Sequence, residues 1–171
     1  MKNHSTLLHP GNHMTGISMI IFFGVLTTGF LSGCDDSNDN YLEGAVTDGY
    51  DMNFDSVRVR LYPETALSIE YVKKTKSGEQ LPLKITIDYP EGELVTGKDY
   101  SLLLEGTISR GAAYDSSPLP QIESGTIHLD EFDAAAGSDV NGAFEAVFIT
   151  TSNAKISLRG GFSAKLDRFE Q

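Results

Sequence analysis

From Tyr41 onward, apolar and polar residues alternate along the chain with a period of two. The clearest runs are Val57-Arg58-Val59-Arg60-Leu61-Tyr62 and Leu83-Lys84-Ile85-Thr86-Ile87-Asp88-Tyr89. Successive side chains of a β-strand point to opposite faces, so this alternation predicts strands that bury one face. A helix would need a period of 3.6, and no sustained pattern of that kind follows Phe30. The chain is therefore expected to fold into β-sheet.

Eight segments fit this description, and turn-forming residues such as Asp48-Gly49, Ser77-Gly78 and Pro90-Glu91-Gly92 separate several of them. The expected strands are 41–47, 57–62, 67–72, 83–89, 100–108, 122–129, 140–149 and 155–166. Short, regularly spaced strands predict an antiparallel β-sandwich or small β-barrel of about eight strands. We expect residues 41–171 to form this single domain. Residues 110–121 and 130–139 are expected to be loops, with room for one helical turn at Ala134-Ala135-Ala136.

Two segments near the C-terminus repeat the pattern Gly-small-Phe-x-Ala-x-apolar. They are Gly142-Ala143-Phe144-Glu145-Ala146-Val147-Phe148 and Gly160-Gly161-Phe162-Ser163-Ala164-Lys165-Leu166. The pattern predicts that the two segments pair as a hairpin. A glycine at the head of each marks a β-bulge or a close approach of two backbones.

The first 33 residues differ from the rest of the chain, because they contain no Asp or Glu and only one basic residue, Lys2. An apolar run covers residues 17–31. As a helix it would reach roughly 22 Å, which is short of the roughly 30 Å hydrocarbon core of a membrane. A basic start, a short apolar run and small residues are typical of a secretory signal peptide. The alternatives are a core helix or a short anchor.

The run ends in Leu31-Ser32-Gly33-Cys34, which contains the only Cys of the chain. This segment resembles the lipobox of bacterial lipoproteins: a Leu, two small residues and then the Cys that is acylated. The resemblance implies a signal peptide at 1–33, cleavage before Cys34, and a diacylglycerol and an N-acyl chain such as palmitate on Cys34. Each buried CH₂ adds about 0.8 kcal/mol of membrane affinity, so two or three acyl chains hold a protein firmly. The competing interpretation of Cys34 is a free thiol or a redox residue.

After Cys34, the polar stretch Asp35-Asp36-Ser37-Asn38-Asp39-Asn40 predicts a flexible tether at 34–40. The chain carries 13 Lys and Arg against 24 Asp and Glu, a formal net charge of −11. Such acidity disfavours nucleic acid as a partner and direct docking on anionic lipid. The expected location is the bacterial cell envelope, where the domain faces the periplasm or the exterior. Its expected partners are the membrane, through the anchor, and an envelope protein.

Residues that could carry catalysis are scarce after Cys34. His128 is the only imidazole there, and it alternates with Ile127 and Leu129, so it is expected to face solvent or a polar flank. Carboxylates are plentiful, but no spacing selects two of them for hydrolysis of a glycosidic bond. The candidates are Glu43, Glu70, Glu105, Glu123 and Glu145. The sequence therefore predicts that the protein is not an enzyme.

One acidic segment, Asp51-Met52-Asn53-Phe54-Asp55, matches the start of a calcium-binding loop. The sixth and twelfth positions depart from that motif, because they hold Ser56 and Tyr62 instead of Gly and Glu. An irregular calcium site at Asp48, Asp51, Asn53 and Asp55 stays possible as a hypothesis, since calcium accepts varied oxygen cages. The alternative is that this segment is an acidic, solvated loop without a bound ion. The basic segment Lys73-Lys74-x-Lys76 is expected to be the solvated tip of a hairpin.

Together these observations predict a lipid-anchored envelope protein whose β-domain has a binding, interaction or structural role. One alternative is a β-barrel that carries a small apolar ligand, which would need an unfilled apolar interior. Another is a hydrolase that uses acidic residues converging in a cleft.

Overall fold

The computed structural model describes residues 40–62, 66–88 and 94–168. These described residues belong to one compact unit. It is built almost entirely of strands, which form one nine-stranded sheet that is nearly closed into a barrel. The strands are β1 (Tyr41–Glu43), β2 (Ser56–Tyr62), β3 (Ala66–Thr75), β4 (Gly78–Asp88), β5 (Asp99–Ser101), β6 (Gly106–Ser109), β7 (Gln121–Glu131), β8 (Asp139–Ile149) and β9 (Lys155–Arg168). The expectation of an all-β sandwich or small barrel is confirmed.

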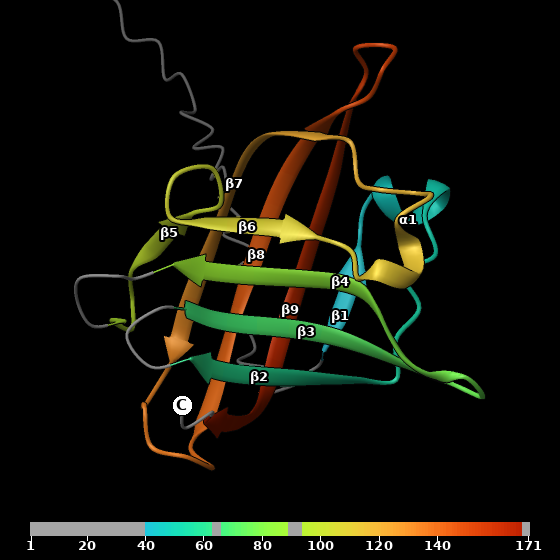
Figure 1. The fold of residues 1–171 in the computed structure, drawn as a ribbon. Helices are drawn as coiled ribbons and strands as arrows, with labels where there is room; N and C mark the ends of the chain where they lie inside the picture. The colour runs from blue at the N-terminus through green and yellow to red at the C-terminus, as the bar shows by residue number, and fades with distance from the viewer. Residues whose placement is uncertain (1–39, 63–65, 89–93, 169–171) are drawn as a thin grey trace, which may run out of the picture. The chain divides into compact units, whose positions relative to one another are not determined.

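The sheet folds into two layers whose strands cross steeply (Figure 1). The front layer contains β2, β3, β4 and β6, and the back layer contains β5, β7, β8 and β9 with β1 beside β9. β9 belongs to both layers: it pairs antiparallel with β8, and its last residues pair in parallel with β2, Val59 opposite Leu166. At the opposite corner, the short turn between β5 and β6 carries the chain from the back layer to the front layer.

The core fills the space between the layers with the inward residues of each strand. From the front layer these include Val59, Leu67, Ile69, Tyr71 and Ile85, and from the back layer Ile127, Val140, Phe144, Phe148 and Leu158. Tyr71 spans the two layers: its ring contacts Phe144 at a centroid distance of 6.2 Å, and its hydroxyl donates to the Gly161 carbonyl at 2.8 Å.

The predicted C-terminal hairpin is confirmed, since β8 and β9 pair over their length without a shift in register. Gly142 lies opposite Phe162, and Phe144 lies opposite Gly160, so each copy of the repeated pattern supplies a glycine to the other's phenylalanine. The glycines therefore mark close packing and not a bulge in this pair.

Two expectations about local structure are wrong. The first strand ends at Glu43, because Gly44 turns the chain with a φ of +120°, and a short helix, α1 (Val46–Gly49), follows. Residues 100–108 form two strands, because the Glu105 side chain accepts the Ser101 N–H and closes a turn between them. The segments 110–121 and 130–139 are loops as expected, apart from strand residues at their ends. Ala134-Ala135-Ala136 makes no helical turn, and the one short 3₁₀ helix among the described residues, η1 (Ala112–Tyr114), lies in the loop after β6.

Candidate functional site

The predicted lipidation segment, Leu31, Ser32, Gly33 and Cys34, lies outside the described residues, so acylation stays a prediction. Among the residues that the structure describes, no helix has the length and apolar character needed to cross a membrane.

The four calcium candidates lie on α1 and on the loop that leads into β2. Asp48 is exposed on α1, and Asp51 is held by its own chain: its Oδ2 is 2.7 Å from Lys73 Nζ, and its Oδ1 accepts the Asn53 backbone N–H and side-chain amide at 3.2 and 2.9 Å. The Asp55 carboxylate accepts the Lys74 N–H at 2.6 Å. An open pocket of about 480 Å³ lies beside this loop.

In these contacts the carboxylates of Asp51 and Asp55, two of the groups that would bind a calcium ion, already accept hydrogen bonds from Lys73, Asn53 and Lys74. The hydrogen bond from Lys73 lowers the pKa of Asp51 below its ordinary value, and the Lys73 ammonium already neutralises that charge. Within the described ranges, no three His, Cys, Asp or Glu side chains are grouped closely enough to hold a metal ion. A calcium site at Asp48, Asp51, Asn53 and Asp55 stays a prediction.

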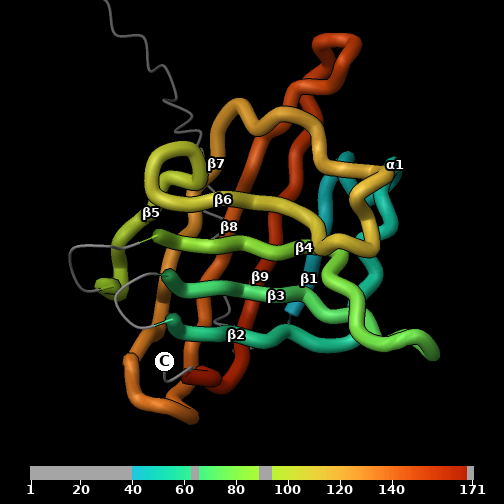
Figure 2. Tube along the Cα trace, viewed as in Figure 1, coloured from blue at the N-terminus to red at the C-terminus, as the bar shows by residue number. Residues whose placement is uncertain are grey.

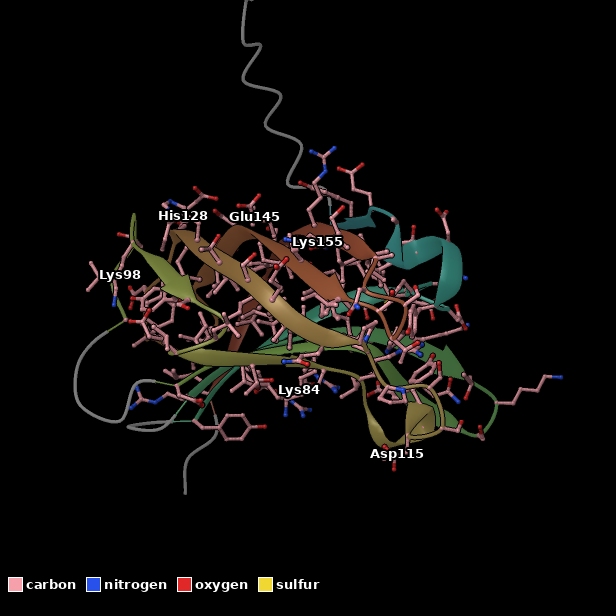
Figure 3. All side chains as sticks on the ribbon, turned by 90° about the horizontal axis from the view of Figure 1, so that it is seen from above. Lys84, Lys98, Asp115, His128, Glu145 and Lys155 are labelled. Atoms are coloured by element: carbon pink, nitrogen blue, oxygen red, sulfur yellow. The ribbon has the colours of Figure 1, made fainter. Side chains whose placement is uncertain are left out.

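His128 lies on the outer face of β7, as expected, between two buried neighbours, Ile127 and Leu129. Its Nδ1 is 2.6 Å from Asp99 Oδ1 on β5, and its Nε2 is 3.6 Å from Asp130 Oδ1. The contact with Asp99 ties the short β5 to β7, whereas Asp130 lies on β7 itself. Figure 3 shows His128 and Glu145 on the same outer side of the back layer.

The five carboxylates considered for hydrolysis do not converge in one cleft. Four of them pair with a basic side chain on a neighbouring segment, and Glu145 is exposed on β8. The pairs are Glu43 with Arg159, Glu70 with Arg58, Glu105 with Lys98 and Glu123 with Lys155.

A charged cluster on the outer face of the front layer was missed by sequence reasoning. Glu70 is only 2% exposed, although its position on β3 faces away from the core. Its Oε2 accepts hydrogen bonds from Arg58 Nε and Nη2 at 2.9 and 2.7 Å and lies 3.5 Å from Arg60 Nη1. Arg58 also bonds Glu79 at 2.8 Å. Burial works to lower the pKa of Arg58, but the bonds to Glu70 and Glu79 outweigh it and raise the pKa.

The alternation of residues 57–62 and 67–72 places Arg58 and Glu70 on outward faces. The sequence cannot show that they meet, because that depends on the register in which Arg58 lies directly opposite Glu70. The Glu70 carboxylate is saturated by its own chain, which makes the cluster a brace between β2 and β3 and not an open site.

A second cleft lies between the end of β6 and the start of β7. We call it the β6–β7 cleft, and its volume is about 320 Å³. Ile108, Leu119, Ile122 and Phe148 give it apolar walls, and Arg110, Tyr114 and Asp115 are its larger polar lining residues. Figure 2 shows that the chain leaving β6 turns back on the side of β6 away from β4 and then runs to β7 in the back layer, and it does not pair with β6.

Arg110 fixes the shape of this cleft. Its guanidinium donates to the carbonyls of Pro82, Ser117 and Asp51 at 3.1, 2.9 and 2.7 Å. It also stacks over the Tyr114 ring at 3.8 Å from the ring centroid. Burial lowers the pKa of Arg110. One side chain therefore holds the loop after β6 against β4 and against the loop before β2.

Searches of protein-family models, of curated proteins and of solved structures find no match to this chain.

Proposed function

We propose that this chain is a lipid-anchored bacterial envelope protein, acylated at Cys34, whose β-domain has a non-catalytic binding role. The observation that carries the proposal is the segment Leu31-Ser32-Gly33-Cys34, which ends an apolar run free of acidic residues and contains the only Cys.

The start of the folded domain is consistent with a short tether. Asn40 is joined to β9 by two hydrogen bonds with Ser163, at 3.2 Å from Asn40 Nδ2 to the carbonyl and 2.6 Å from the Ser163 N–H to Asn40 Oδ1. The residues between Cys34 and Asn40 span at most roughly 20 Å when extended. The anchor would therefore keep the domain close to the membrane surface.

The packed core argues against a carrier of apolar ligands. Tyr71 occupies the space between the layers with edge contacts to Phe54 and Phe144, at centroid distances of 4.9 and 6.2 Å. A ligand placed there would have to displace these rings and the Tyr71 hydrogen bond. A surface role fits this interior better.

The carboxylates also favour binding over hydrolysis. A hydrolase would need two of them converging on one substrate. Here Glu43, Glu70, Glu105 and Glu123 are each paired with a different basic residue. Such pairs fix strands and turns and leave no two of these four acids facing each other in a shared cleft.

The test is the substitution Cys34→Ser in the full-length protein. We expect it to move the protein out of the membrane fraction, or to leave it uncleaved, without changing the unfolding midpoint of the domain. Ser32→Ala is the matched control, because it keeps a small residue before the Cys and should stay anchored. If the Cys34→Ser protein differed in mass from the unsubstituted protein by the exchange of sulfur for oxygen alone, and kept its membrane association, the proposal would be overturned.

A further inference from the structure

β6 is the last strand of the front layer and pairs with β4 alone. In an antiparallel pair, alternate residues exchange hydrogen bonds with the partner strand. The Asp88 N–H donates to the Glu105 carbonyl at 2.7 Å, so the next bonded pairs are Thr86 with Thr107 and Lys84 with Ser109. The N–H and C=O groups of Gly106 and Ile108 consequently point away from β4.

These main-chain groups have no other partner in the part of the chain that the structure describes. β7 does not pair with β6, and the pairing of β7 toward β5 reaches only Gly125, whose carbonyl accepts the Leu102 N–H at 2.9 Å. An unpaired strand edge of this kind is a template for an added strand.

The β6–β7 cleft lies at the end of this edge, since Ile108 and Ser109 are among its lining residues. Leu119 and Ile122, which are only partly buried, offer apolar contact inside the cleft. At the other end of β6, the turn exposes two leucines, Leu103 at 50% and Leu104 at 88%. Apolar surface therefore lies at both ends of a main-chain edge that is unpaired among the described residues.

The charge beside the cleft is negative. Asp115 is exposed there, and its carboxylate makes no ion pair or hydrogen bond with any described residue (Figure 3). The neighbouring Arg110 does not neutralise it, because its guanidinium is bound to the three backbone carbonyls of Pro82, Ser117 and Asp51. With a net charge of −11, the whole chain also attracts cations.

We propose that the β6 edge and the β6–β7 cleft bind an extended segment of a partner protein, in which an apolar residue lies next to a Lys or Arg. The segment pairs with Gly106 and Ile108 as an added strand, its apolar side chain enters the cleft, and its cation meets Asp115. This inference rests on the proposed binding role and names the surface and the partner chemistry. An extended peptide fits better than a small apolar molecule, because free N–H and C=O groups two residues apart match the repeat of a strand.

The first test is amide hydrogen exchange, measured by NMR on the full chain in detergent micelles. In the free protein, the Gly106 and Ile108 amides should exchange fast while those of Thr107 and Ser109 are protected. The probe comes from a displayed library of random heptapeptides selected on the same protein. We expect enriched peptides to pair an apolar residue with Lys or Arg and to slow exchange at Gly106 and Ile108 by at least tenfold.

Two variants locate the binding. Asp115→Asn should weaken an enriched peptide about two- to fivefold, the range for an exposed ion pair, whereas the matched control Asp48→Asn should not. Ile108→Pro removes an outward N–H without touching the β4 ladder and should abolish binding in protein whose circular dichroism is unchanged.

Failure to enrich any peptide, or binding that leaves exchange at Gly106 and Ile108 unchanged, would overturn the inference. Peptides that are selected for apolar side chains alone, and that do not slow exchange at Gly106 and Ile108, would also overturn it. A peptide that binds elsewhere on the domain would overturn this surface but leave the proposed binding role intact. Acylation of Cys34 is tested by a separate experiment, so failure of peptide binding and failure of the proposed lipid anchor can be told apart.

Discussion

A Cβ atom on Gly160 of β9 would lie 2.6 Å from Cε1 of Phe144, its partner residue on β8. The same atom would lie 2.6 Å from the Tyr41 carbonyl oxygen on β1. The ring of Phe144 therefore occupies the space that a side chain at position 160 would need, and β1 closes the position from the other side.

We predict that Gly160→Ala destabilises the domain by about 1–3 kcal/mol, the usual cost of overpacking. Denaturant unfolding measures the loss. Gly49→Ala is the matched control, because no atom lies within 4 Å of its added Cβ, and it should cost nothing. Combining Gly160→Ala with Phe144→Leu should recover part of the loss; an additive result would contradict the proposed clash.

The second prediction concerns the buried carboxylate of Glu70. Glu70→Ala removes the one buried carboxylate that Arg58 and Arg60 share and leaves the more exposed Glu79 and Asp167 beside them, and we expect a loss of about 3 kcal/mol. Glu79 binds the same Arg58 but its side chain is 49% exposed, so Glu79→Ala should cost less than about 1 kcal/mol. Equal losses in the two variants would show that burial does not decide the strength of the cluster.

The third prediction tests the link between the layers. Tyr71→Phe removes the hydroxyl that donates to the Gly161 carbonyl and leaves a buried acceptor unpaired, which should cost about 1–3 kcal/mol. Tyr114→Phe removes a longer, partly buried bond to Gln80 and should cost less. If thermal unfolding of Tyr71→Phe matched the unsubstituted protein, the hydroxyl would have no part in joining the layers.

The fourth prediction concerns pH and the turn between β5 and β6. The hydrogen bond from Lys98, followed by that from the Ser101 N–H, lowers the pKa of Glu105 below its ordinary 4.5. A lowered pKa in the folded state stabilises the fold above about pH 4.5, and this contribution disappears as the pH falls through the lowered value.

The measurement is the free energy of unfolding between pH 7 and pH 3. Glu105→Gln should lower stability at pH 7 and show a shallower loss on acidification. Glu145→Gln is the control, because this exposed carboxylate makes no ion pair or hydrogen bond within the described ranges, and its profile should match the unsubstituted protein. Parallel profiles for all three proteins would remove Glu105 as a contributor.

Strand positions were predictable because alternation reports directly on which face is buried. Residues 57–62, 140–149 and 155–166 became β2, β8 and β9 with small changes at their ends. The run Leu102-Leu103-Leu104 gave no such information, since three apolar residues in succession carry no period. Only the contact between Glu105 and Ser101 shows that the chain turns there, with Leu102 inside and Leu104 outside.

The candidate sites were less predictable, because they depend on contacts between distant segments. The sequence placed Asp51 in an acidic loop but could not show Lys73 beside it, 22 residues later. Burial of Glu70 follows from register and from the arginines opposite it. The β6–β7 cleft depends on where the sheet stops pairing, and no local pattern encodes that position.

The most direct test of the lipid-anchored binding domain is the intact mass of the protein extracted from native membranes. The account predicts a chain that begins at Cys34 and carries the added mass of a diacylglycerol and an N-acyl chain. A mass equal to the unmodified chain from Met1 would contradict it, and the segment Leu31-Ser32-Gly33-Cys34 would then be a coincidence.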